Sequence, residues 1–115
     1  MTPKQFDLIE RIRALLADES EVREVSMFGG VSVMVNENMI VSAMKDGDLL
    51  VRVDADRHNE LLNKPGASQA AMGPGRDMGP GWIKVEAAAV RGQEQLSAWV
   101  DDAMAYNSVV TGGNA

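Results

Sequence analysis

The fold is decided by the stretch VREVSMFGGVSVMVNENMIVSAMKDGDLLVRV, residues 22–53. Apolar and polar side chains alternate there in short runs, which are interrupted at 29–30, 37–38 and 46–48. A period of two residues indicates β-strands. The interruptions are too short for the crossover that neighbouring parallel strands require. The sequence therefore predicts four antiparallel strands in a meander.

Helical patterns surround this stretch. Thr2 and Pro3 are typical of a helix start, and the first helix is expected to reach about Ala17. Its apolar face would consist of Phe6, Ile9, Ile12 and Leu16. A short second helix is predicted over 55–63, with Asp54 as its cap and with Leu61 and Leu62 buried. A fifth strand over 82–86 and a last helix over 93–106 complete the order.

The element order α-β-β-β-β-α-β-α predicts an α+β fold. Its economical form is a two-layer sandwich, in which an antiparallel sheet of about five strands has helices on one face. We expect one domain over residues 1–106 and a flexible C-terminal tail over 107–115. The solvated face of the sheet would carry Met34 and Met44. The chain has eight methionines, and these either fill gaps in the core or form an adaptable partner surface.

Composition excludes several classes of function. The chain has 115 residues and a formal net charge of −6, which disfavours direct nucleic-acid binding. It contains no cysteine and a single histidine, His58, so thiolate catalysis, cysteine-based metal sites and sites with two imidazoles are excluded within one chain. No segment has the pattern of a signal peptide or of a membrane helix. We expect a cytoplasmic protein without a cofactor, a bound metal or catalytic residues.

Several short segments occur in an order that is characteristic of a known family. They are MFGGV at 27–31, MIVSA at 39–43, DLLVRV at 48–53, LLNKP at 61–65 and GRDMGPGW at 75–82. Together they resemble the N-terminal domain of the TfoX/Sxy family of bacterial competence regulators, over about residues 1–106. The chain departs from the family pattern at Asp77, where proline is common.

The resemblance implies a fold similar to that of secretion chaperones and no catalytic residues. It also implies an indirect role in gene regulation, through a protein partner such as the transcription machinery. The competence regulators carry a second, C-terminal domain. We expect this chain to be a stand-alone protein of the N-terminal-domain type.

The loop over 72–81 is the best sequence candidate for a contact surface. Its glycines permit close backbone approach, its prolines limit the entropy lost on ordering, and Arg76 can pair with an acidic group. The candidate contact residues are Gly75, Arg76, Met78, Gly79 and Trp82. The same composition is also found in ordinary long connections.

Other conspicuous residues have plain structural interpretations. Gly29 and Gly30 suit a bend between strands, because no lysine or helix follows them as a phosphate loop requires. His58 is expected to be half-exposed and inert. Trp82 and Trp99 are most simply core residues.

Two functions remain in view. The first is a non-enzymatic module that docks a protein partner on an exposed edge or face of the sheet, or that forms a homodimer. The second is a small-ligand or anion site that uses the loop over 72–81. Neither requires nucleic-acid or membrane binding.

Overall fold

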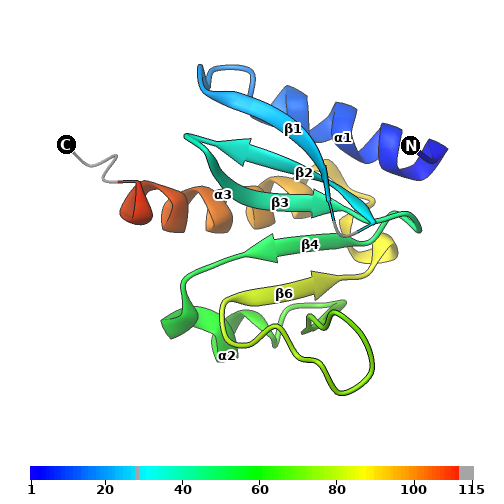
Figure 1. Cartoon of the computed structure of the whole chain (residues 1–115), viewed down its shortest axis with the longest axis vertical. Coiled ribbons are helices and arrows are strands. Elements are labelled where there is room, and N and C mark those ends of the chain that lie inside the picture. Colours follow the sequence, from blue (N-terminus) through cyan, green and yellow to red (C-terminus); the bar gives the residue numbers. More distant parts are fainter. Residues whose placement is uncertain (28, 112–115) are drawn as a thin grey trace.

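A single antiparallel sheet organises the part of the chain that the computed structural model describes, residues 1–27 and 29–111. Its six strands lie in the order β1-β2-β3-β4-β6-β5 (Figure 1). Their bounds are β1 (Val22–Met27), β2 (Gly30–Val35), β3 (Asn38–Ala43), β4 (Leu49–Arg52), β5 (Ala67–Gln69) and β6 (Trp82–Val85). The predicted meander of four strands is confirmed, and β6 is the predicted fifth strand.

The sixth strand, β5, was not expected, because the sequence around 67–81 looks irregular. It has only three residues, Ala67, Ser68 and Gln69, and none of them is β-branched or aromatic. Such a run carries no readable period of two. It is a strand because it pairs with the outer edge of β6, where Ser68 lies opposite Lys84.

The helices are α1 (Pro3–Leu15), α2 (His58–Leu61) and α3 (Gln93–Val110), and the 3-10 helices are η1 (Ala55–Arg57) and η2 (Ala87–Val90). The three α-helices cover one face of the sheet, and α1 and α3 pass behind the strands in Figure 1. The α+β sandwich with helices on one face is therefore confirmed.

The start of α1 is fixed by a capping box. The Thr2 hydroxyl accepts a hydrogen bond from the Gln5 N–H at 3.2 Å, and the Gln5 side chain accepts one from the Thr2 N–H at 2.9 Å. Gln5 is buried, and its amide also donates to the Ala43 carbonyl at 3.0 Å, which ties α1 to the end of β3. The prediction for Phe6 was wrong: it is exposed, and Leu8 takes its place in the core.

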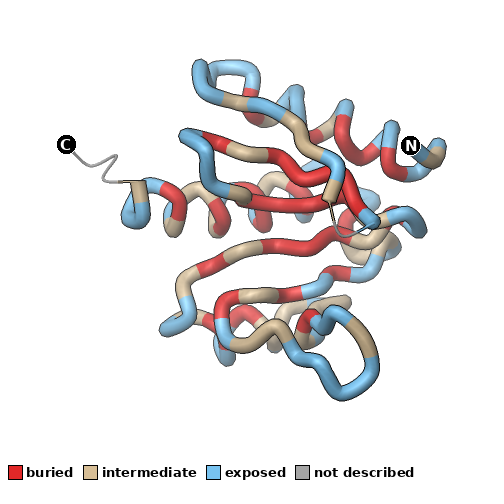
Figure 2. Tube along the Cα trace, viewed as in Figure 1, coloured by how far each residue is buried: buried red, intermediate tan, exposed pale blue. Residues whose placement is uncertain are grey.

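The core lies between the sheet and the helices. Alternate strand residues point into it, among them Val33, Val41, Val51 and Ile83, which are all almost completely buried (Figure 2). Trp99 of α3 is the largest of the fully buried side chains, so its predicted core role is confirmed.

A β-bulge changes which side chains of β3 reach the uncovered face. Val33 pairs with Val41 and Met34 pairs with Met39, so Ile40 is the extra residue. Both Ile40 and Val41 belong to the core. The bulge thereby places Met39 beside Met34 on the face opposite the helices.

Charged side chains on either side of α2 contact α3. Asp102 of α3 accepts from Arg57 at 3.0 Å and from Lys64 at 3.4 Å, and the Lys64 ammonium lies 4.2 Å from the centre of the Trp99 ring. Hydrogen bonds to Glu60 and Asp102 raise the pKa of the Arg57 guanidinium. Asp54 caps η1 as predicted, and Leu61 is buried, but Leu62 is only half-buried.

The C-terminal helix is longer than expected. It runs to Val110, so residues 107–110 are not a flexible tail. Asn107 is buried and donates to the Val35 carbonyl at 3.0 Å, which provides a tertiary reason for the helix to continue. The rest of the predicted tail, from Gly112 onward, lies outside the described residues. Along residues 1–27 and 29–111, no helix combines the length and the apolar character needed to cross a membrane.

The turn between β2 and β3 consists of Asn36 and Glu37, one residue earlier than predicted, because Asn38 already pairs with Val35. Both turn residues have positive φ, 52° for Asn36 and 67° for Glu37. Two-residue hairpin turns commonly have this conformation, but it is strained for a glutamate.

Replacing Glu37 by glycine should therefore stabilise the protein. We expect Glu37→Gly to raise the free energy of unfolding by about 0.5 to 1 kcal/mol, since glycine relieves the strain at the cost of some unfolded-state entropy. Urea unfolding measures the change. The matched control is Glu37→Ala, which removes the same carboxylate but keeps the strain. An equal gain in both variants would contradict the explanation.

Candidate functional site

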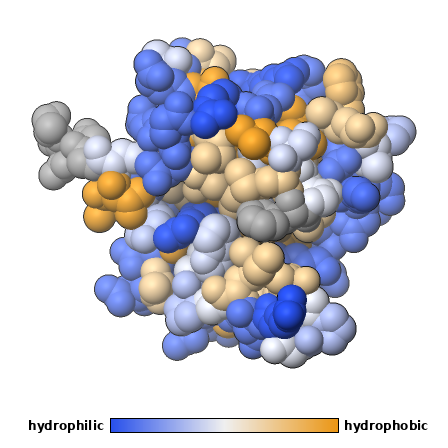
Figure 3. Space-filling view, viewed as in Figure 1, coloured by the Kyte–Doolittle hydropathy of each residue, from blue (hydrophilic) through white to orange (hydrophobic). Residues whose placement is uncertain are grey.

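A groove lies on the face of the sheet that the helices leave uncovered. Its volume is about 290 Å³. Figure 3 shows moderately apolar surface across the middle of this face, bordered by hydrophilic side chains. The strands and the connection after β5 line it together, with Ser32, Met39, Ser42, Met44, Leu50, Ala70, Ala71, Met72, Met78 and Lys84. We call this feature the methionine groove.

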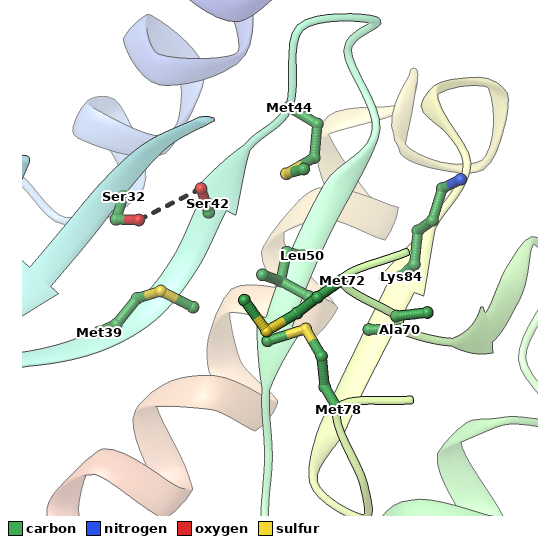
Figure 4. A pocket seen from close by; sticks show the side chains of 10 residues that line it. Ser32, Met39, Ser42, Met44, Leu50, Ala70, Met72, Met78 and Lys84 are labelled. Atoms are coloured by element: carbon green, nitrogen blue, oxygen red, sulfur yellow. Dashed lines mark hydrogen bonds between the residues drawn. The ribbon is translucent and has the colours of Figure 1, made fainter. Parts of the chain in front are cut away.

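Methionine side chains form most of the apolar walls. Met39 and Met44 come from β3 and the residue after it, and Met72 and Met78 come from the connection between β5 and β6 (Figure 4). In this view the Met72 and Met78 thioethers lie over Leu50 of β4. None of these four methionines belongs to the buried core, so they do not act as core filler, and their role as a partner surface stays a prediction.

The floor of the groove is polar. Ser32 and Ser42 lie opposite each other on β2 and β3, and their hydroxyl oxygens are 3.3 Å apart (Figure 4). Only one of the two hydroxyl hydrogens is needed for this bond. Gly30 leaves room beside the pair, because a Cβ there would lie 2.6 Å from the Ser42 oxygen and 3.3 Å from the Met44 sulfur. Gly30 is thus required for space, whereas Gly29 has a φ of 76° and serves the predicted bend.

One wall of the groove is a small hairpin within the connection between β5 and β6. Ala71 and Asp77 form an isolated bridge, the Met72 N–H donates to the Arg76 carbonyl at 2.9 Å, and the Met78 N–H donates to the Ala70 carbonyl at 2.9 Å. These bonds place Met72 and Met78 next to the groove. Met72 is nevertheless 62 % exposed.

The base of this hairpin is held by His58, which was wrongly expected to be half-exposed. Its side chain is 6 % exposed. The Gly81 N–H donates to His58 Nδ1 at 2.9 Å, and His58 Nε2 lies 2.8 Å from the Gln69 side-chain oxygen. Because Nδ1 accepts the Gly81 N–H, Nε2 is the ring nitrogen that can donate a hydrogen bond to Gln69.

Gln69 extends the same network into the connection. Its amide nitrogen lies 3.0 Å from the Gly79 carbonyl and 3.3 Å from the Trp82 carbonyl. Gly81 has the least room for a side chain, because a Cβ there would lie 2.8 Å from the Val53 carbonyl oxygen. Its φ of 92° also favours glycine. A side chain at 81 would therefore disrupt the junction of the connection with β4.

The five contact residues suggested by the sequence do not converge on one site. Met78 lines the groove, and Gly79 and Trp82 belong to the base of the hairpin. Gly75 and Arg76 are exposed at the hairpin tip, where Gly75 has a φ of 70°. Sequence reasoning missed Met39 and the serine pair, and it included Met72 only as the first residue of the loop over 72–81. Alternation of the strands could have indicated Ser32 and Ser42.

A second feature adjoins the groove at the end of β4. The Arg52 guanidinium carbon lies 4.6 Å from the centre of the Trp82 ring and 5.4 Å from that of Tyr106, and Arg52 Nη2 is 3.5 Å from the Tyr106 hydroxyl. Arg52, Tyr106, Met39, Asn38, Ala103, Asn107 and Val110 enclose a cleft of about 90 Å³. We call it the Arg52 cleft. Trp82 is half-buried beside Arg52, not a core residue as predicted.

The charged strand residues are divided between the two faces of the sheet. Glu24 of β1 faces the helices and forms an ion pair with Arg13 of α1. The alternation of the strands places Arg23, Arg52 and Lys84 on the open face. Arg23 forms an ion pair with Glu37 at 2.7 Å, and the Glu37 carboxylate raises the pKa of Arg23. Lys84 forms an ion pair with Asp48 at 3.3 Å.

Within the described ranges, no three His, Asp or Glu side chains lie close enough together to hold a metal ion. The groove itself presents thioethers, two hydroxyls and one ammonium group. The thioethers can contact apolar side chains, the hydroxyls can donate or accept hydrogen bonds, and the ammonium group can donate them.

Removing the His58 side chain should loosen the hairpin. In His58→Ala the buried Gly81 N–H loses its acceptor and Gln69 loses its partner, so we expect a loss of about 2 to 3 kcal/mol in the free energy of unfolding. Amide hydrogen exchange should become faster at Gly81 and Met78. The control is Asn59→Ala, at the exposed neighbouring position. Equal exchange rates in the two variants would contradict the role given to His58.

A search of curated proteins finds no match. The family model of the TfoX N-terminal domain matches residues 14–106, which include all six strands and most of α3. The match begins near the end of α1, later than the resemblance suggested. It spans the MFGGV segment, in which Phe28 lies outside the described residues. The chain therefore belongs to the TfoX N-terminal domain family.

Proposed function

We propose that the chain is a non-enzymatic interaction module that docks a protein partner on the open face of its sheet. The methionine groove receives apolar side chains of that partner. The observation that carries the proposal is the placement of four methionines around one groove, on the face opposite the helices.

Methionine suits such a role. Its unbranched, polarisable side chain adapts to different partners, and surfaces that bind variable apolar segments are often rich in methionine. A groove of about 290 Å³ has room for the side chains of a peptide segment rather than for a folded domain.

Charge favours a protein over a nucleic acid as the partner. The chain carries −6 overall, and two of the three basic strand residues on the open face are already paired with carboxylates. Neutralising several phosphates would require a larger basic surface. A protein segment that brings apolar side chains matches the face better.

Membership of the family supports a regulatory setting. By analogy with the competence regulators, the partner belongs to the transcription machinery, and the module affects gene expression indirectly in the cytoplasm. Fold and family do not by themselves fix a function, so the partner must be identified by experiment. A second copy of the chain could occupy the groove instead. The mass of the captured protein distinguishes this case in the experiment below.

Capture from a native lysate tests the docking surface. The immobilised chain is incubated with nuclease-treated lysate at physiological abundance, alongside Met72→Asp and Ala98→Asp variants. Met72 is largely exposed, so aspartate there should leave the fold intact while placing a charge at the groove. We expect at least a tenfold loss of partner with Met72→Asp.

The control variant changes an exposed residue on α3, away from the groove. Ala98→Asp adds the same charge and should retain the partner. Thermal melts of both variants check their folding. Retention of the partner by Met72→Asp, or capture of no partner by the wild-type chain, would refute the proposal.

The second candidate is a small-ligand or anion site at the connection between β5 and β6. The size of the groove and the exposure of Arg76 favour it. In this case a ligand should raise the melting temperature, and Arg76→Ala should abolish the shift if the ligand is an anion. A thermal-shift screen without any hit would remove this candidate.

A further inference from the structure

The open face carries one basic strand residue without a carboxylate partner among the residues that the structure describes. Arg23 meets Glu37 and Lys84 meets Asp48, but the hydrogen bond of the Arg52 guanidinium is to the Tyr106 hydroxyl, at 3.5 Å. This distance is long for such a bond. Arg52 therefore retains most of its donor capacity.

Two aromatic rings hold the guanidinium in place. The Arg52 guanidinium carbon lies 4.6 Å from the Trp82 ring centre and 5.4 Å from the Tyr106 ring centre, and Arg52 is half-buried. Cation–π contacts stabilise the charge without using its N–H donors. A guanidinium fixed in this way is preorganised to bind a planar anion with two N–H groups.

The cleft beside Arg52 neighbours the methionine groove at the end of the sheet, where α3 contributes Ala103, Tyr106, Asn107 and Val110 to its lining. Met39 lines both features. Leu50 of the groove and Arg52 of the cleft are two residues apart on β4 and point to the same face, which separates them by about 7 Å along the strand. Residues of a partner that are two apart in an extended segment, or three or four apart in a helix, have a similar spacing.

We propose that Arg52 and the Tyr106 hydroxyl bind an aspartate or glutamate side chain of the partner, next to an apolar side chain that enters the methionine groove. The occupant is thus an acidic, amphipathic segment of another protein. This assignment rests on the proposed function, which it deepens by naming the chemistry of the partner. A carboxylate fits the cleft of about 90 Å³, and it is a weaker source of repulsion for a chain of charge −6 than a polyphosphate.

The smallest probe that combines an apolar chain with a carboxylate is octanoate, and octanol is its neutral counterpart. NMR titrations follow the methionine methyl groups as a measure of groove binding, and the Trp82 indole N–H as a measure of cleft binding. We expect octanoate to bind roughly tenfold more tightly than octanol at low salt, since the ion pair adds a charge-assisted bond. Arg52→Gln should remove this difference. The control Arg23→Gln, on the same face, should preserve it.

Capture from lysate supplies the second arm. An Arg52→Gln chain should lose the partner that the wild-type and Arg23→Gln chains retain. Retention of the partner by Arg52→Gln would overturn the inference, as would equal binding of octanoate and octanol to the wild-type chain. If Arg52→Gln retains the partner but Met72→Asp loses it, the result supports the docking surface and refutes the assignment of Arg52 to a partner carboxylate. If no chain captures a partner, the proposed function and this partner assignment both fail, and Arg52-dependent binding of octanoate then indicates a small-molecule carboxylate.

Discussion

Successive residues of a β-strand point to opposite faces of the sheet, and the three α-helices of the described chain cover only one of these faces. The other face must therefore be shielded by its own side chains. Ser32 and Ser42 show the consequence, because they are only 1 % and 2 % exposed although they lie on the face without helices. The two serines line a groove there together with four methionines and the connection between β5 and β6.

The hairpin between β5 and β6 is held in position through polar contacts more than through packing. Met72 is largely exposed, so the hairpin that carries it gains little from burial of apolar area. Its base is instead fixed by His58, Gln69 and the Gly81 backbone. A buried donor left without an acceptor is costly, which makes this small network specific for one loop position. The wall of the groove thus depends on a histidine that does not line it.

Local patterns predicted most of the fold, since each is decided by neighbouring residues. The meander follows from the alternation over 22–53, and the start of α1 follows from Thr2 and Pro3. The features that the sequence did not predict share another cause, which is not local. Strand β5, the burial of His58 and the extension of α3 beyond Tyr106 depend on partners distant in sequence, namely β6, Gly81 and Val35. The groove was predictable in part, because alternation assigns Met44 to the open face, whereas Met72 reaches the groove through tertiary structure.

The groove and the Arg52 cleft differ in rigidity, and this difference bears on how a partner would be selected. Methionine walls adapt to many apolar side chains and so contribute affinity with little discrimination. A guanidinium between Trp82 and Tyr106 is fixed in direction, and it penalises a partner that buries it without a carboxylate. Both Arg52 and Tyr106, together with every residue lining the groove, fall within residues 14–106, the range that the family model matches. The residues to which this selectivity is assigned therefore lie within the matched domain of this chain, and they do not include the capped beginning of α1.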